Sequence, residues 1–522
     1  MTTALPLRPY TPLRMVLTVC GRCFTEEPDR EVDYATDILQ GNLVLQDGSV
    51  YLRRHCRRGH GEVVSLYDED YELWEYLQQW RVPTREIIPD TPDNVLPIPM
   101  GYGQGLGELQ TQHSCILLVD VTENCNLRCP TCFAESGPGI GRYARLPHIL
   151  RTLDASIERE GGKIDVLMLS GGDPTVHPEI VEIIREATAR KVTRVLLNTN
   201  GIRVARDDAF LAALADLRDR VEVYLQFDGF ELATHLHHRG EDLRHMKEAA
   251  IRRLTDAGIF TTLVMVVADG VNDHEIGRVA EYAFDTDFIA GVAYQPVFGS
   301  GRSNAIDPMR RMTTTGVLKR IGPQSNGRAG AEDFIALPCS HPDCCAITYF
   351  VRGDDGRHRS IPSLVGLERL RANLGLVGNR IAADDGLWEA LIGMMSETTT
   401  VSRPELVDYL VNICEACDIG LSGFFRSVGG YVRGGRAGAA AEVGRRTKRL
   451  SVKSFMDAWT LNIERLQQCC VHVGSVDGDS DPVRIPFCAR QLFGSLRQRT
   501  SAGQVGARQL VQLDGLVSSA RP

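Results

Sequence analysis

The stretch VTENCNLRCPTCFAE, residues 121–135, places three cysteines close together, at Cys125, Cys129 and Cys132. A structural zinc site uses four ligands, and a disulfide uses two sulfurs. A cluster of four irons is held by four thiolates. Because only three thiols lie together here, the spacing predicts an iron-sulfur cluster in which one iron has no protein ligand.

The composition indicates a globular chain of several domains. At 522 residues, the chain exceeds the size at which a single core keeps growing, so we expect two or three domains. Its net charge of −9 argues against a nucleic-acid partner. The longest apolar runs, such as LVMVVA at 263–268, are too short to span a membrane, and the N-terminus lacks the apolar core of a signal peptide. We therefore expect a cytoplasmic protein without a transmembrane segment, a placement that also allows peripheral contact with a membrane.

The fifteen cysteines occur in groups, which in a reducing compartment favours metal binding over disulfides. Residues 1–112 are predicted to form an N-terminal metal-ribbon domain, in which residues 43–53 form a hairpin around an Asp-Gly turn. A Cys-x2-Cys pair precedes this hairpin and a Cys-x3-His pair follows it, a pattern typical of a ribbon that holds one metal ion. The predicted ligands of this ion, either zinc or iron, are Cys20, Cys23, Cys56 and His60.

Residues 113–300 alternate between apolar runs and amphipathic segments. The runs predicted as strands are 115–121, 164–170, 193–199, 221–227, 259–267 and 290–297. This alternation indicates a parallel α/β sheet, either doubly wound or curled into a partial barrel. In such folds the chemistry lies at the C-terminal ends of the strands. The three-cysteine loop follows the first strand and SGGDPT (170–175) follows the second, so we expect both loops to open on one face.

The region 301–522 has weaker periodicity, and a Gly/Ala/Arg-rich stretch at 429–449 reads as a flexible connector. Cysteines recur on both sides of this stretch, enough to supply further metal sites. Cys414 and Cys417 lie on a predicted helix and are equally well explained as buried small hydrophobic residues.

The Cys-x3-Cys-x2-Cys loop directly after a first strand resembles the radical S-adenosylmethionine (SAM) enzymes. The resemblance implies a partial (β/α)6 barrel in which Cys125, Cys129 and Cys132 hold a [4Fe–4S] cluster and SAM chelates the fourth iron. It also implies that an electron from a reductant such as flavodoxin or ferredoxin cleaves SAM. The product is a 5′-deoxyadenosyl radical, which abstracts hydrogen from unactivated carbon.

The same resemblance implies a set of SAM-binding residues. SGGDPT stands where the superfamily has a Gly-Gly-Glu-Pro segment, with Asp173 in place of the glutamate. NTNG (198–201) and QFDG (226–229) resemble the loops that meet the SAM ribose and carboxylate, although their polar residues are also ordinary turn formers. The implied contacts are Gly171, Gly172, Asp173, Thr199, Gln226, Asp228 and Arg239.

A narrower resemblance rests on the ribbon, on PCSHPDC (338–344) and on CCVHVGSVDG with IPFCA (469–489). It points to a branch that contains tetraether lipid synthase and 7,8-dihydro-6-hydroxymethylpterin methyltransferases. The branch implies a rubredoxin-like mononuclear site and one or two auxiliary [4Fe–4S] clusters in a C-terminal region. The first-choice auxiliary ligands are Cys339, Cys344, Cys470 and Cys488, with Cys345 and Cys469 as adjacent alternates. The continuation IPFCARQLFG and the Gly/Ala-rich insertion depart from the branch and bear on the substrate.

Three functions follow as hypotheses. The first is an enzyme that forms carbon–carbon bonds at unactivated carbon, as in the coupling of lipid tails. The second is a radical methyltransferase that acts on a pterin, and the third is a non-catalytic iron-sulfur protein that transfers electrons. A lipid substrate predicts an apolar tunnel, for which 387–395 and 420–425 offer apolar side chains. A small, polar, closed pocket would instead favour a pterin.

Overall fold

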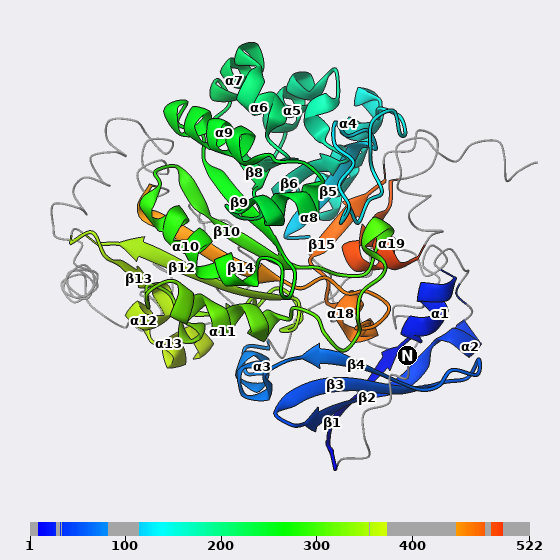
Figure 1. Cartoon of the computed structure of the whole chain (residues 1–522). Helices are drawn as coiled ribbons and strands as arrows, with labels where there is room; N and C mark the ends of the chain where they lie inside the picture. The colour runs from blue at the N-terminus through cyan, green and yellow to red at the C-terminus, as the bar shows by residue number, and fades with distance from the viewer. Residues whose placement is uncertain are drawn as a thin grey trace, which may run out of the picture.

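The computed structural model (Figure 1) describes residues 9–27, 32, 34–81, 114–353, 355–372, 445–475 and 482–493. The segments expected to line a lipid tunnel, 387–395 and 420–425, lie outside these ranges, as do Cys414, Cys417 and residues 429–444 of the expected connector. Among the residues described, no helix is long and apolar enough to cross a membrane.

The N-terminal unit is a four-stranded antiparallel sheet in the order β1-β2-β3-β4. Its strands are β1 (Thr11–Thr18), β2 (Leu39–Gln46), β3 (Ser49–Cys56) and β4 (Gly61–Asp68), and its helices are α1 (Gly21–Glu26), α2 (Tyr34–Asp37) and α3 (Tyr71–Gln78). Asp47 and Gly48, which join β2 to β3, both have positive φ, as a tight hairpin turn requires. The predicted hairpin is therefore present. It places the end of β3 close to the start of α1.

The central sheet contains six parallel strands in sequence order. They are β5 (Ile116–Thr122), β6 (Ile164–Gly171), β7 (Val192–Thr199), β8 (Val221–Gln226), β9 (Thr261–Val267) and β10 (Ile289–Pro296). The helices between them are α4 (Leu146–Arg159), α5 (Ile180–Ala189), α6 (Ile202–Arg206), α7 (Asp208–Ala215), α8 (Leu232–Arg239), α9 (Arg244–Asp256) and α10 (Ile276–Asp285). Parallel strands buried on both faces read as continuous apolar runs, which is why the sequence predicted them. The parallel α/β fold is confirmed.

Residues beyond 300 extend this sheet at both edges. β14 (Thr447–Lys453) pairs parallel with β10, and β15 (Val471–Gly474) pairs parallel with β5. The remaining strands are β11 (Ile335–Ala336), β12 (Cys345–Arg352), β13 (His358–Ser360) and β16 (Arg484–Pro486). The helices of this region are α11 (Thr314–Gln324), α12 (Ile361–Val365), α13 (Leu367–Ala372), α18 (Ile463–Gln467) and α19 (Phe487–Leu492).

The sheet curls around its own interior. One cavity is lined by residues from strands that lie far apart in the strand order: Ile116 on β5, Tyr224 on β8, Ile347 on β12 and Val471 on β15. An untwisted, flat sheet could not bring these strands to one cavity. The curvature is that of the expected partial barrel, with α4, α5, α7 and α9 on its outer side (Figure 1).

Candidate functional site

The three cysteines of the opening stretch line one cavity, on the loop that follows β5. Cys129 is buried, whereas Cys125 and Cys132 are half-buried. Burial raises the pKa of the Cys125 thiol to about 12. Without a metal this thiol keeps its proton, so metal binding here must release it.

Arg302, on the loop after β10, clamps the cysteine loop. Its side chain donates to the carbonyl oxygen of Cys129 at 2.7 Å and to that of Ser136 at 2.8 Å. Its backbone N–H donates to the carbonyl oxygen of Cys132 at 3.0 Å. No motif in the sequence marks Arg302, although its place after the sixth strand puts it at the expected edge of the sheet.

The Gly-Gly loop after β6 packs directly against the backbone of the cysteine loop. A Cβ on Gly171 would lie 1.9 Å from the carbonyl oxygen of Thr122, and a Cβ on Gly172 would lie 2.1 Å from that of Asn124. The N–H of Gly172 donates to Thr122 O at 2.8 Å. The glycines are thus required by backbone-to-backbone contact between the two loops, a reason that the sequence analysis did not foresee.

Asp173 ties the Gly-Gly loop to the loop after β7. Its buried carboxylate accepts from the Thr199 hydroxyl at 2.9 Å and from the Asn200 N–H at 2.8 Å. It also accepts from the N–H of Thr175 at 2.9 Å, which caps a short 3-10 helix. Because Asp173 accepts hydrogen bonds from both loops, it fixes their positions in the cavity wall.

Arg239, on the cavity wall, forms an ion pair with the buried Asp228. Arg239 donates to both carboxylate oxygens of Asp228, at 2.5 and 2.7 Å, and to the side-chain oxygen of Gln226 at 3.0 Å. Burial alone would raise the pKa of Asp228, but Arg239 outweighs it and lowers this pKa to about 2. Both groups are therefore charged at neutral pH.

The strand ends together form one cavity of about 100 Å³. It is lined by the three cysteines and by Gly171, Gly172, Asp173, Thr199, Gln226 and Arg239. Asp228 does not line it but holds Arg239 in place. The wall also includes polar residues that the sequence analysis did not single out: Asn198, Asn200, Gln295 and Arg302.

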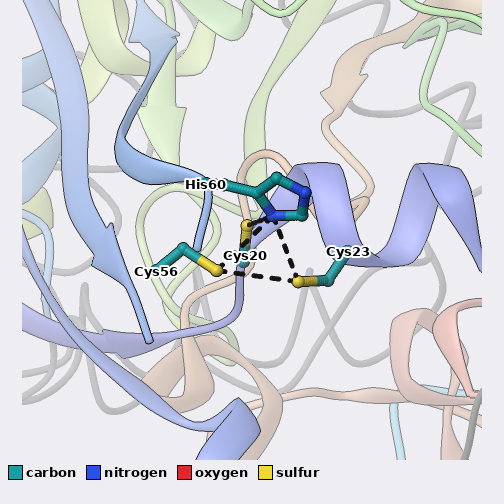
Figure 2. Close-up of side chains that lie close together, drawn as sticks. All are labelled: Cys20, Cys23, Cys56 and His60. Atoms are coloured by element: carbon teal, nitrogen blue, oxygen red, sulfur yellow. Dashed lines mark hydrogen bonds between the residues drawn. The ribbon is translucent and has the colours of Figure 1, made fainter. Parts of the chain in front are cut away.

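The four predicted ribbon ligands converge in the N-terminal unit (Figure 2). Their ligand atoms all lie within 4.8 Å of one another. His60 Nδ1 lies 3.6 Å from Cys20 Sγ and 3.4 Å from Cys23 Sγ, and Cys23 Sγ lies 3.7 Å from Cys56 Sγ. Four ligands about 2.3 Å from a tetrahedral ion would lie about 3.8 Å apart, so the residues fit a single metal ion.

Glu26 supports this group from outside. Its carboxylate lies 3.1 Å from His60 Nε2, which leaves Nδ1 facing the three sulfurs. A carboxylate on the second nitrogen is the usual way to fix the orientation of a metal-binding histidine.

The cysteines of the C-terminal region meet inside the curled sheet. Cys339 Sγ lies 3.8 Å from Cys470 Sγ and 2.9 Å from the sulfur of Cys115, and the three form one buried group. Cys344 and Cys488 line a second cavity of about 60 Å³, together with Cys345, Cys469 and Cys470. The four first-choice auxiliary ligands and their two alternates are thus in one neighbourhood.

Cys115 is the member that the sequence analysis did not assign to this group. It immediately precedes β5, and the parallel register of Ile116 with Val471 brings it beside Cys470. No local spacing could have identified it, because its partners are more than 200 residues away in the chain.

The two cavities share an aromatic wall. Phe133 and Phe298 line the first cavity, whereas Phe455 and Phe487 line the second. The ring centroids of Phe133 and Phe487 are 5.6 Å apart, and those of Phe298 and Phe455 are 5.5 Å apart. The C-terminal cysteines therefore lie just beyond the wall of the three-cysteine cavity.

Three thiols and a Gly-Gly loop at the carboxyl ends of adjacent parallel strands define a class of protein. Residues 119–283 match the family described as the radical SAM superfamily. The central sheet of the chain therefore carries a radical SAM domain, as its resemblance predicted. A domain of this kind implies a [4Fe–4S] cluster and SAM, and the residues around the first cavity fit both groups.

Individual relatives refine the comparison. The chain is 26% identical over 505 residues to the 7,8-dihydro-6-hydroxymethylpterin dimethyltransferase of Methanocaldococcus jannaschii. The aligned residues cover 91% of this chain and 92% of the relative. It is 30% identical over 167 residues to a mycofactocin maturase of Mycobacterium ulcerans, covering 31% of this chain and 42% of the relative. A solved structure of a radical SAM methyltransferase from Sphaerobacter thermophilus is 16% identical, with a TM-score of 0.31, and covers 63% of this chain and 77% of that one.

Proposed function

We propose that this radical SAM enzyme forms a carbon–carbon bond on a compact, partly polar substrate, and that methylation of a pterin-type ring is the first candidate. The observation that carries the proposal is the first cavity, which is small and has polar side chains on its wall. Similarity along nearly the whole chain to an enzyme named for a pterin substrate supports the same choice.

In this proposal the loops have separate roles. Cys125, Cys129 and Cys132 hold the cluster, while Gly171, Gly172, Asp173, Thr199, Gln226 and Arg239 form the SAM-binding wall, with Asp228 behind it. When bound, the cluster and SAM supply a radical able to abstract hydrogen from carbon. Asn198 and Gln295 line the cavity and are the proposed contacts to polar atoms of a substrate; Asn198 also hydrogen-bonds to Ser170 and Gln226, and Gln295 donates to the Tyr224 hydroxyl.

We further propose an auxiliary iron-sulfur centre at the C-terminal cysteines. Cys115, Cys339 and Cys470 form its core, and Cys344 and Cys488 are the nearest further thiols of the predicted set. Burial raises the pKa of Cys345 and of Cys488 to about 12, so a metal bound there must displace protons. The N-terminal group is proposed to hold one iron or zinc ion.

Coupling of lipid tails is the second candidate. Ile116, Leu337, Ile347, Val471 and Phe455 give the second cavity a largely apolar lining, which suits an alkyl chain. The polar side chains on the wall of the first cavity favour the compact substrate over the long one.

The test is an anaerobic incubation of the reconstituted, reduced chain with SAM and 7,8-dihydro-6-hydroxymethylpterin, followed by mass spectrometry. The proposal expects a methylated pterin from the native chain and none from an Asn198→Ala, Gln295→Ala variant that still cleaves SAM. If the pterin is unchanged while lipid extracts from cells expressing the chain contain coupled tails, the second candidate replaces the first.

A further inference from the structure

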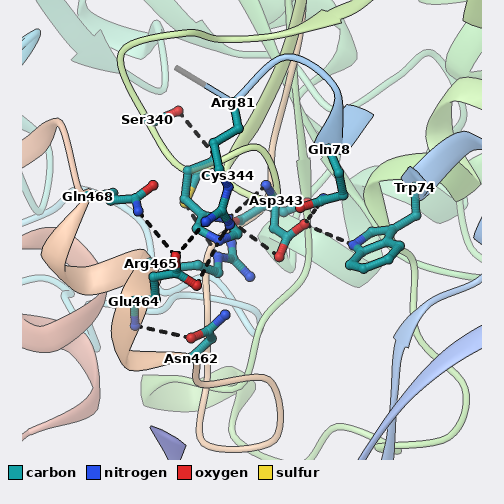
Figure 3. Close-up of polar contacts among 12 residues, drawn as sticks. Trp74, Gln78, Arg81, Ser340, Asp343, Cys344, Asn462, Glu464, Arg465 and Gln468 are labelled. Carbon is teal, nitrogen blue, oxygen red and sulfur yellow. Dashed lines mark hydrogen bonds and ion pairs between the residues drawn. The ribbon is translucent and has the colours of Figure 1, made fainter. Parts of the chain in front are cut away.

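A buried polar network fixes the residue next to Cys344 to the N-terminal unit (Figure 3). The carboxylate of Asp343 accepts from the Tyr67 hydroxyl at 2.7 Å, from Trp74 Nε1 at 2.9 Å and from Gln78 Nε2 at 2.7 Å. Tyr67 lies on β4, and the other two donors lie on α3. The loop that carries Cys344 is therefore held by three donors from the N-terminal unit.

Arg465, on α18, reaches Cys344 from the opposite side. Its Nε donates to the Cys344 sulfur at 3.4 Å, and its Nη2 donates to the carbonyl oxygen of Ser454 at 2.7 Å. The N–H of Ser454 in turn donates to the carbonyl oxygen of Cys344 at 3.0 Å. Cys344 is thus held through both its backbone and its sulfur.

The helix that carries Arg465 is anchored as well. Arg81 donates to the carboxylate of Glu464 at 2.6 Å and contacts the buried His341 ring at 2.7 Å. Because Glu464 precedes Arg465, this pair fixes the start of α18 against the segment before Cys344. The guanidinium of Arg465 consequently has little freedom to turn away from the sulfur.

The charge of Arg465 is directed at the cysteine site. The side chain is buried and interacts electrostatically with the Cys344 thiol and the Asp343 carboxylate, although among the described residues no ion pair within 4.0 Å joins its guanidinium to a carboxylate. A buried cation is costly unless negative charge lies near it, and thiolate ligands would add such charge beside Asp343. A centre ligated by thiolates carries negative charge, and hydrogen bonds to its sulfurs help to set its reduction potential.

We infer that Arg465 is a positioning residue of the auxiliary site, which holds Cys344 and raises the reduction potential of the centre by donating a charge-assisted hydrogen bond to that sulfur. The inference rests on the proposed auxiliary centre. The positive charge stabilises the reduced form more than the oxidised form, because the reduced form carries one more negative charge. The equilibrium concerned is uptake of one electron from an external one-electron donor, with no proton transferred to Arg465.

The experiment uses the full chain with Cys125, Cys129 and Cys132 changed to alanine, so that the radical SAM cluster does not contribute. Iron and sulfide are quantified after anaerobic reconstitution, and the midpoint potential is measured by a dithionite titration followed by electron paramagnetic resonance. Arg465→Met removes the donor and the charge, whereas Arg465→Lys keeps the charge but cannot reach both acceptors in the same way. Arg328→Met is the matched control, because Arg328 pairs with Asp285 and does not line the second cavity.

Arg465→Met is expected to shift the one-electron equilibrium about tenfold toward the oxidised form. This corresponds to a midpoint potential lower by about 59 mV for one electron. Arg465→Lys should shift it less in the same direction, and Arg328→Met should leave it unchanged. If Arg465→Met does not retain the centre, the Arg465→Lys variant provides the test. An Arg465→Lys variant with the native iron content and an unchanged midpoint potential would overturn the inference.

Cys470→Ala in the same background separates the two proposals. If Cys470→Ala loses iron and sulfide while both Arg465 variants keep the native midpoint potential, the proposal of an auxiliary centre stands and only the role of Arg465 is overturned. Iron and sulfide contents that Cys470→Ala does not lower overturn the auxiliary centre and this inference together.

Discussion

At the scale of single residues, the Asp228–Arg239 pair shows how a residue that does not line the cavity can still shape its wall. Asp228 is fully buried and touches no cavity space, yet both its oxygens accept from Arg239, which lines the cavity. Removing one partner of a buried pair leaves an uncompensated charge, and this costs more than the pair contributes.

We predict that Asp228→Asn lowers the free energy of unfolding by about 3–5 kcal/mol and weakens SAM binding. The pKa of Asp228 is lowered to about 2, so its stabilising contribution is present at neutral pH and is lost only as the pH falls through about 2. Urea denaturation and equilibrium dialysis with SAM measure the two effects. Asp242→Asn is the control, because Asp242 pairs with Arg244 at the surface. Equal denaturation midpoints for the two variants would refute the role given to Asp228.

The sequence alone predicts some residues of the site and leaves others unmarked. The three cysteines and the Gly-Gly loop were found because their spacing is local. Arg302 and Gln295 were missed because no motif near them in the chain marks them as wall residues; the fold brings them to the cavity. Cys115 needed the pairing of β5 with β15, which joins segments more than 350 residues apart.

At the scale of elements, the contact between the loops after β5 and β6 makes a sharp prediction. Gly172→Ala should destabilise the chain by about 3 kcal/mol or more, because its Cβ would overlap the Asn124 backbone. Gly161→Ala is the matched change: Gly161 has a φ of +71° but open space around it, so only backbone strain of about 1–2 kcal/mol is expected. Chemical denaturation compares them, and a smaller loss in Gly172→Ala would contradict the packing.

The ribbon gives a second prediction. His60→Ala should remove one metal equivalent from the full chain and lower the protection of β3 and β4 in hydrogen exchange, since metal binding contributes folding free energy. Glu26→Gln should weaken metal affinity about 10–100-fold, whereas Glu62→Gln, which alters a surface pair with Arg53, should not. Metal analysis after titration with a chelator measures both. Unchanged metal content in His60→Ala would refute the site.

Elements were predictable where the pattern is local and repeated. The six parallel strands appear as apolar runs, and the β2–β3 hairpin is marked by its Asp-Gly turn. The strands β14 and β15, which flank the six parallel strands, were not foreseen. Their residues gain strand structure only by pairing with β10 and β5, and the sequence contains no signal for partners so distant.

At the scale of the whole molecule, the N-terminal sheet and the barrel meet through buried polar groups. Asp68 at the end of β4 accepts from the Thr313 hydroxyl at 3.1 Å and from the Thr315 hydroxyl of α11. Burial raises the pKa of Asp68 to about 7. Because this pKa is raised in the folded state, the related stability is present at low pH and is lost as the pH rises through about 7.

We predict that the free energy of unfolding of the native chain falls between about pH 4 and pH 7, by up to about 1.4 kcal/mol per pH unit, and falls less in Asp68→Asn. Urea titrations at several pH values measure the slopes. Identical slopes would show that Asp68 is ionised throughout this range.

The central claim is that Cys125, Cys129 and Cys132 form the centre at which SAM is cleaved. The most direct measurement is 5′-deoxyadenosine released by the anaerobically reconstituted, dithionite-reduced chain in the presence of SAM, with the triple alanine variant in parallel. We predict 5′-deoxyadenosine from the native chain and none from the variant. Equal release by both proteins would contradict the assignment.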